Sequence, residues 1–210
     1  MTMKHYLALP AAFAVLAFAS CENPADKTEK AAVKDAVEKK TDTAGGTKYS
    51  FTPSSKIEFE GSKVTGSHKG EFKSFTGYFT VKDGAPVGND HKVTIDMNST
   101  TTDNEKLTGH LKNADFFDVP NNPDAIFDVT ELKKESDSKY LVSGNFKLRG
   151  VTKNISFPAE VAKDGENVKI KATFNINRQD FGVKYQSSKA DDLIRDEVVI
   201  RLDLEAKPGA

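Results

Sequence analysis

The chain has 210 residues, and 30 lysines and arginines face 31 aspartates and glutamates, so its formal net charge is −1. This balance excludes the basic footprint of a nucleic-acid-binding protein and offers no electrostatic attraction to anionic lipid. The chain also has one cysteine, which excludes an internal disulfide, so burial and backbone pairing must stabilise the fold.

The N-terminus has the layout of a secretory signal. Lys4 precedes an uncharged apolar run, residues 6–19, and the small residue Ser20 stands directly before Cys21. The run has 14 residues, whereas a helix that spans a bilayer needs about 20. We therefore predict that residues 1–20 are a signal peptide that is removed on export. An ordinary secreted protein with a leftover thiol is the alternative reading.

The position of Cys21 resembles the signal of bacterial lipoproteins, although Phe18 replaces the usual leucine three places before the cysteine. In such proteins the thiol is acylated and the cysteine becomes the first mature residue. The resemblance implies that Cys21 is lipidated and anchors the chain to a membrane, facing the periplasm or the cell surface of a bacterium. Glu22 stands where inner-membrane lipoproteins carry aspartate, which favours the outer membrane.

Residues 22–46 are rich in charge and poor in large apolar side chains. Eleven of these 25 residues are charged and none is aromatic, so the segment cannot bury a core of its own. We predict that residues 21–46 form the lipidated cysteine and a flexible charged tether, which ends at Gly45 and Gly46. A short helix over residues 32–37 that binds a partner is the alternative.

From residue 48 onward the apolar residues recur with a period of two. The alternation is clearest over residues 168–176 and 198–204, and it predicts about eight half-buried strands between residues 48 and 206. Asp83-Gly84 and Asp164-Gly165 are hairpin turn signals, so neighbouring strands are expected to be antiparallel. The strands could bury their apolar faces in two packed sheets or in one closed barrel.

One segment, residues 104–118, interrupts the strand pattern. Leu107 and Leu111 have helical spacing, and Pro120 and Pro123 follow the segment. A short helix is therefore predicted near residues 104–118. It would cover one end of the strand structure either as a lid over a cavity or as a plug.

Three blocks of the chain resemble the YceI family of periplasmic proteins. They read HLKNADFFDVPNNPDAIF at residues 110–127, GNFKLRGVTKNISFP at residues 144–158 and FNINRQDFGV at residues 174–183. The resemblance implies an all-β domain over residues 47–208, an antiparallel eight-stranded lipocalin-like barrel. It also implies a binding protein that carries or sequesters a long apolar ligand, such as a polyisoprenoid, a quinone-like or a fatty-acid-like molecule.

The composition suits such a cavity, because 14 phenylalanines and no tryptophan supply large side chains without polar atoms. Candidate cavity residues are apolar side chains on predicted strands, on the helix or close beside them. They are Phe72, Phe75, Phe79, Leu107, Leu111, Phe116, Phe117, Phe127, Phe146, Phe174, Ile176 and Phe181. The alternative is a structural barrel whose core these residues fill and whose surface docks a partner protein, the identity of which the sequence does not reveal.

His110, Arg178 and Asp180 are the polar candidates for the mouth of the barrel. Arg178 and Asp180 stand where a strand ends and a long excursion to Asp196 begins. They could orient the polar head of a ligand through charge-assisted hydrogen bonds. A structural clamp that holds the excursion on the rim is the reading we favour for this pair.

The sequence offers little support for catalysis. His68, His91 and His110 have no metal-site spacing, and the chain contains no nucleophile elbow and no phosphate-binding glycine loop. We therefore expect a binding protein that is not an enzyme and that needs no metal or cofactor. A metal site assembled by the fold from the three histidines stays open as an alternative.

Overall fold

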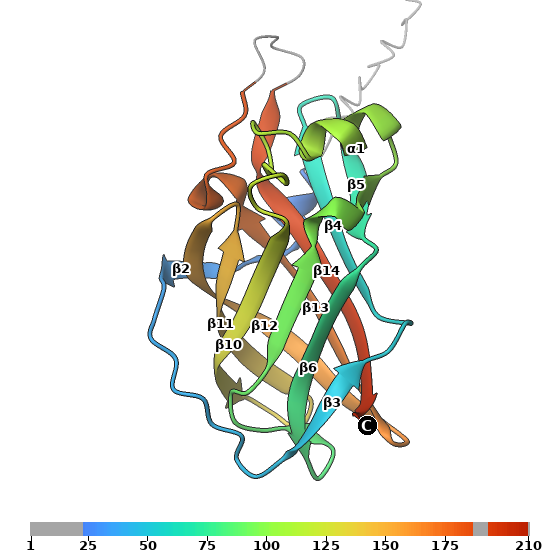
Figure 1. Cartoon of the computed structure of the whole chain (residues 1–210), viewed down its shortest axis with the longest axis vertical. Coiled ribbons are helices and arrows are strands. Elements are labelled where there is room, and N and C mark those ends of the chain that lie inside the picture. Colours follow the sequence, from blue (N-terminus) through green and yellow to red (C-terminus); the bar gives the residue numbers. More distant parts are fainter. Residues whose placement is uncertain (1–22, 187–192, 210) are drawn as a thin grey trace, which may run out of the picture.

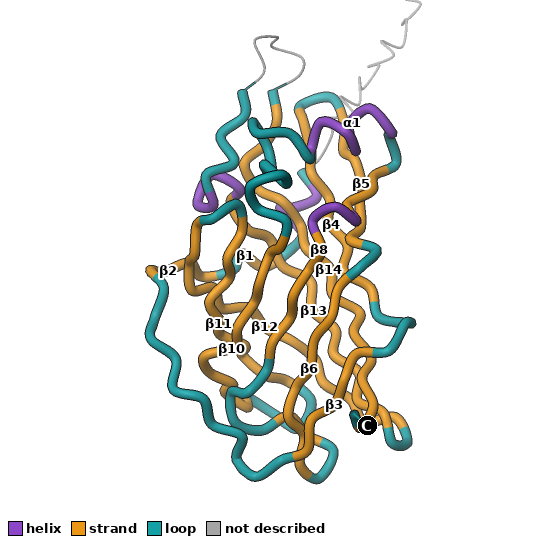
Figure 2. Tube along the Cα trace, in the orientation of Figure 1, coloured by secondary structure: helices purple, strands orange, loops and turns teal. Residues whose placement is uncertain are grey.

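The computed structural model describes residues 23–186 and 193–209. Strands dominate, and they form one tall sheet that curves round on itself (Figures 1 and 2). The elements are η1 (Pro24–Lys27), β1 (Glu29–Lys30), β2 (Ala32–Asp35), β3 (Thr47–Phe51), β4 (Lys56–Lys63), β5 (Gly66–Phe72), β6 (Phe75–Lys82), β7 (Ala85–Pro86), β8 (Lys92–Asp96), η2 (Met97–Ser99), β9 (Thr100–Thr102), α1 (Glu105–Leu111), β10 (Asp124–Lys134), β11 (Lys139–Leu148), β12 (Val151–Asp164), β13 (Asn167–Asn177), η3 (Arg178–Phe181) and β14 (Ile194–Pro208).

The sheet closes into an antiparallel eight-stranded barrel, which confirms the predicted fold. Going round the wall, β13, β12, β11, β10, β8, β6, β3 and β14 are neighbours, and β14 pairs back to β13. β14 is long enough to pair with β3 near its end and with β4 before that, so β4, β5 and β9 extend the wall at the α1 end. We call the α1 end the upper half of the barrel.

The period of two in the sequence sorts side chains between the two faces of the wall. On β13, Val168, Ala172 and Phe174 are buried inside the barrel, whereas Lys171 and Thr173 between them are exposed. The predicted Asp83-Gly84 turn joins β6 to β7, and both of its residues have positive φ, as the favoured two-residue hairpin turn requires.

The predicted helix is present but shorter than the segment proposed for it. Asn104 caps its start, because the side-chain oxygen accepts a hydrogen bond from the Leu107 amide at 3.1 Å. The helix ends at Leu111, and tight turns carry the chain on to β10. Across residues 23–186 and 193–209, no helix has the length and apolar character that a membrane span requires.

The N-terminal segment differs from its prediction as a flexible tether. Residues 23–46, which we call the N-terminal strap, lie against the barrel wall and then run down its outside to β3 (Figure 1). Asn145 exchanges two hydrogen bonds with the backbone of Val37, at 2.7 and 3.1 Å. Farther along, the Lys39 ammonium pairs with Asp128, and the backbone of Asp42 bonds to Asn89.

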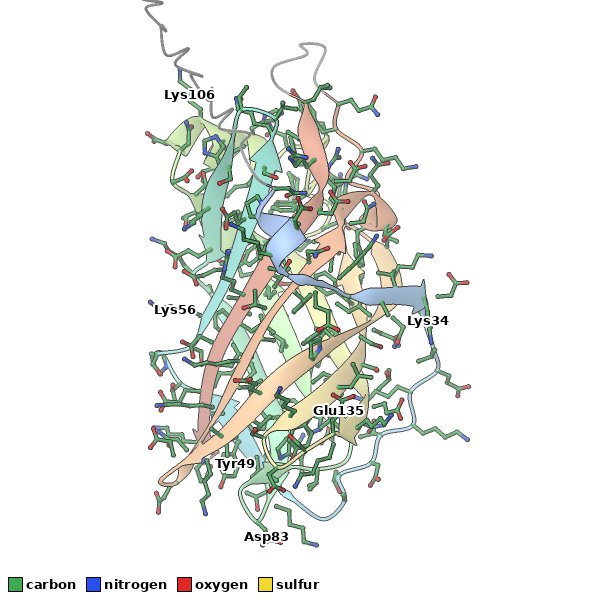
Figure 3. The ribbon with its side chains drawn as sticks, turned by 180° about the vertical axis from the view of Figure 1, so that it is seen from behind. Lys34, Tyr49, Lys56, Asp83, Lys106 and Glu135 are labelled. Atoms are coloured by element: carbon green, nitrogen blue, oxygen red, sulfur yellow. The ribbon has the colours of Figure 1, made fainter. Side chains whose placement is uncertain are left out.

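The first part of the strap fills a gap in the wall. β12 and β13 pair with each other only between residues 160–164 and 167–171, and above this they separate. There β1 pairs in parallel with β13, and β2 pairs antiparallel with β12. The strap therefore bridges the gap between β12 and β13 (Figure 3). Ala31, between β1 and β2, is 2% exposed and belongs to the main core cluster. The strap thus provides hydrogen-bond partners for backbone groups of β12 and β13 where these strands no longer pair with each other. Composition alone did not predict this pairing.

The strap can be tested through Asn175, a buried residue on the outer face of β13. Its amide donates to the carbonyls of Ala25 and Thr28, at 3.3 and 3.2 Å, and to the Thr28 hydroxyl at 3.0 Å. We expect Asn175→Ala to lower the free energy of unfolding by about 1–2 kcal/mol, because buried acceptors lose their donor. Hydrogen exchange of residues 23–35 should accelerate in parallel.

Thr173→Ala is the matched control, since Thr173 is exposed on the same face of the same strand. It should leave both measurements close to the wild-type values. Exchange of the wild-type strap at the rate of an unfolded chain would contradict the docked arrangement.

His91, at the start of the segment that leads into β8, is buried in its neutral form. Its Nδ1 accepts a hydrogen bond from the Thr80 amide at 2.9 Å, and its Nε2 lies 3.2 Å from the carbonyl of Gly88. Burial lowers the pKa of His91 to about 4, with the Gly88 carbonyl and Asp90 opposing the shift and Lys39 adding to it. Protonation of Nδ1 would also break the bond to Thr80.

This burial predicts a pH dependence of stability. Between pH 6.5 and 4 the unfolded chain takes up a proton at His91 that the folded chain does not bind, so the free energy of unfolding falls as the pH falls. The stability contributed by neutral His91 is fully present above pH 6.5, and about 3 kcal/mol is lost when the pH falls to 4. Urea denaturation at several pH values in this range should show that the free energy of unfolding falls less with pH in His91→Gln than in the wild type. An equal pH dependence in the two proteins would contradict the assignment.

Candidate functional site

The upper half of the barrel is hollow. A cavity of about 300 Å³ lies beneath α1, and apolar side chains from the strands, from α1 and from the loops beside it form most of its wall. Phe59, Val198 and Ile200 are examples from the two paired strands β4 and β14. A filled core, the alternative raised from the sequence, therefore does not describe this half of the molecule.

Nine of the residues proposed from the sequence line this cavity. They are Phe72, Leu107, Leu111, Phe116, Phe117, Phe146 and Ile176, with the polar candidates His110 and Arg178. Strand period or helical spacing identified Phe72, Leu107, Leu111, Phe146 and Ile176, and the other four were proposed from their places beside the helix or at a strand end; closure of the barrel brings all nine together.

The other candidates lie elsewhere. Phe79 and Phe127 line a second, smaller cavity of about 80 Å³ in the lower half of the barrel. Phe75, Phe174 and Phe181 line neither cavity, since Phe174 and Phe181 are buried in the core and Phe75 is half-buried against it. Phe181 is 0% exposed and packs edge-on against Phe146 at 5.2 Å between ring centroids. Phe174 and Phe181 therefore fill the core.

Two inward-facing glycines explain how bulky rings leave space in the barrel. A Cβ atom on Gly70 would lie 2.2 Å from the Phe59 ring, and one on Gly144 would lie 2.5 Å from the Phe127 ring. Each ring therefore lies flat against the backbone of the next strand, where a glycine has no side chain. The Phe59 ring, held against the wall, leaves the upper cavity open beside it, whereas the Phe127 ring also leans on Phe157.

Three rings gather where α1 meets the rim. Phe116 stacks on Tyr185 with 4.7 Å between centroids, and the His110 ring meets both edge-on at 4.8 and 5.0 Å. His110 also pairs with Asp115, with 2.8 Å between Nε2 and Oδ2. Because space remains beneath them, α1 and these rings cover the cavity as a lid and do not act as a plug.

Arg178 is a clamp at the rim, as the favoured reading proposed, but its partner is not Asp180. Its guanidinium pairs with Asp196 at 2.9 Å and donates to the carbonyls of Val183 at 2.5 Å and Arg195 at 3.2 Å. Burial lowers the pKa of Arg178, and the ion pair with Asp196 opposes that shift. Arg178 thus holds both ends of the excursion between β13 and β14 on the barrel.

Sequence reasoning missed several wall residues. Phe59 lies on a predicted strand, but the period of two does not indicate how high in the barrel a residue lies. Gly61 also lines the cavity, and a Cβ atom there would meet no other atom within 4 Å. Tyr185 and Val183 lie in the excursion after η3, where no periodicity marks an inward face.

Each of the three histidines has its own hydrogen-bond partner. His68 pairs with Asp103 at 2.8 Å, His110 with Asp115, and His91 is buried against Thr80. Within the part of the chain that the structure describes, no three His, Cys, Asp or Glu side chains are grouped as a metal site would need. Cys21 and the predicted signal peptide lie outside the described residues.

Sequence comparison finds relatives among bacterial proteins. The UPF0312 protein PA0423 of Pseudomonas aeruginosa is 32% identical over 142 residues, which cover 65% of this chain and 72% of the relative. The UPF0312 protein plu2095 of Photorhabdus laumondii is 36% identical over 140 residues, covering 62% and 72%.

Two known structures share the fold. BcnA of Burkholderia cenocepacia matches with a TM-score of 0.65 and 23% identity over 80% of this chain and 100% of BcnA. A polyisoprenoid binding domain from Saccharophagus degradans matches with a TM-score of 0.65 and 17% identity over 78% and 99%. At these identities the likeness establishes the barrel alone. The model of the YceI-like domain matches residues 49–206, and the chain therefore belongs to the YceI family.

Proposed function

We propose that this protein is a lipid-anchored binding protein that holds a long apolar ligand in the upper half of its barrel, without chemical turnover. The observation that carries the proposal is the cavity of about 300 Å³ with a mostly apolar wall beneath a cover of one short helix and a few rings. Its volume lies at the lower end of the range of known ligand pockets, about 300–1,000 Å³.

The chemistry of the wall favours a hydrocarbon chain. Aliphatic and phenylalanine side chains present no hydrogen-bonding atoms, so an apolar chain leaves no buried polar group unsatisfied there. Each methylene transferred from water to such a wall contributes about 0.8 kcal/mol. A polyisoprenoid, a quinone tail or a fatty acid would suit, and the relative from Saccharophagus degradans, a polyisoprenoid binding domain, supports the first of these.

The polar groups of the wall lie near the rim. Lys63, His68, His110 and Arg195 line the cavity together with Ser62, and no carboxylate does so among the described residues. A ligand whose chain points downward would therefore place its polar head among basic side chains. These groups provide donors for the oxygen atoms of a quinone, an alcohol or an acid.

The strap changes how far an anchor at Cys21 would let the barrel move. Asn23 is buried and accepts a hydrogen bond from the hydroxyl of Ser62, a residue of the cavity wall, at 3.2 Å. Two residues of extended chain span at most about 7 Å, so an acylated Cys21 would hold the upper half of the barrel at the membrane surface. Capture of a ligand directly from that membrane follows from this arrangement.

Gly61→Phe tests the cavity. The new ring would enter open space and occupy the volume of the ligand, so the affinity for a fluorescent polyprenyl probe should fall at least tenfold, the equivalent of about 1.4 kcal/mol. Organic extracts of the purified wild-type protein should contain a lipid that mass spectrometry detects, and extracts of the variant should contain less of it.

Thr173→Phe is the matched control, because it places the same ring on the exposed outer face of β13. It should bind the probe as the wild type does. A wild-type barrel without extractable lipid that also fails to take up the probe would refute the binding function.

Cys21→Ser tests the anchor. The wild-type mature chain should carry the mass of its acyl groups and fractionate with membranes, whereas the variant should lack that mass and appear in the soluble periplasmic fraction. Probe binding by the purified variant should be unchanged, since Cys21 precedes the barrel. An unmodified wild-type thiol in the mature protein would disprove lipidation.

A further inference from the structure

The two cavities of the barrel lie at different levels and are separate. No described residue lines both of them. On β10, Ala125 lines the upper cavity and Phe127 lines the lower one. On β14, Ile200 lines the upper cavity and Leu202 lines the lower one. On both strands the change from one cavity to the other falls between two successive inward-facing residues.

Aromatic rings occupy this boundary. Phe157 of β12 and Phe174 of β13 stack face to face, with 4.0 Å between centroids and 9° between planes. Phe127 of β10 leans on Phe157 at 5.6 Å. Phe174 is 4% exposed and lines neither cavity, so its ring belongs to the barrier itself. We call these three residues the aromatic partition.

The partition is held from several sides. Gly144 allows the Phe127 ring to lie against β11, and Phe146 meets Phe127 at 6.4 Å from the upper side. Stacked and edge-on contacts of this kind add to the burial of each ring. A ligand chain that descends from the rim would end against these rings, because dense packing leaves no passage beside them.

We infer that the aromatic partition sets the length of chain that the barrel accommodates; this inference rests on the proposed binding function. A cavity of about 150 Å³ accepts one benzene, so the upper cavity of about 300 Å³ has room for about twelve carbons. On the same scale, the lower cavity and the space of one phenylalanine ring would extend the chain to about twenty carbons.

A homologous series tests the inference in the full-length protein. Saturated n-alkyl carboxylates of increasing length compete with the dye anilinonaphthalene sulfonate for the wild-type protein. Affinity should rise about threefold to fourfold with each carbon and then level off near twelve. In Phe157→Ala the rise should continue to near twenty carbons, since removal of one ring joins the two cavities.

Phe79→Ala is the matched control. Phe79 lines the lower cavity and packs against Tyr49 and Phe51, away from the partition, so its loss enlarges that cavity and leaves the barrier intact. The plateau should stay near twelve carbons. If Phe157→Ala fails to fold, Phe157→Leu removes the ring with less loss of volume and should move the plateau in the same direction.

The outcomes separate this inference from the proposed function. A wild-type protein that binds neither a member of the series nor the polyprenyl probe would overturn both. Binding with a plateau near twelve carbons in wild type, Phe79→Ala and Phe157→Ala alike would overturn the partition and leave the binding function standing. A wild-type plateau near twenty carbons would likewise show that the rings are no barrier.

Discussion

The ladder between β13 and β14 is the constraint on which the structure depends. Ten residue pairs join these last two strands and close the sheet, so the barrel exists only once the end of the chain is in place. Closure fixes the width of an eight-stranded barrel, whose interior is just wide enough for side chains or for one ligand. It also commits β13 to β14 along its whole length, while β12 stays paired with β11. The upper ends of β12 and β13 then separate, and the strap occupies the gap.

Within that fixed width, the placement of phenylalanine rings decides where space remains. Phe59 lies flat over Gly70 on the neighbouring strand, and the lumen beside it is open. Among the described glycines none has Phe157 or Phe174 as its nearest neighbour, and these two rings, on the neighbouring strands β12 and β13, stack on each other. Phenylalanine therefore forms part of the side wall of the upper cavity at one height and the aromatic partition below that cavity at another. The difference depends on pairs of residues on adjacent strands and on their register.

The period of two predicts which face of a strand is buried, and this sets how much of the fold and of the cavity could be predicted from the sequence. A period of two identifies the inward face of β13 or β14, and the resemblance supplies closure, so the barrel and most of the upper wall were predictable. Periodicity does not report depth, which is why Phe174 and Phe72 looked alike although only Phe72 lines the cavity. The strap escaped prediction because its stability comes from backbone pairing and from Asn145 and Asn175, outward-facing residues that look like any wet strand position.

The docked strap would shorten the link between the barrel and an anchor at Cys21. A free tether of 25 residues would have let the domain sample a distance of roughly 25–30 Å from its anchor. With the strap paired into the wall, the chain from Cys21 to Asn23 is all that would separate an acyl group from the barrel. Such a short link restricts orientation as well as distance. The rim, with its aromatic cover and the Arg178 clamp, would then face the layer in which long apolar molecules reside, so that transfer need not pass through water.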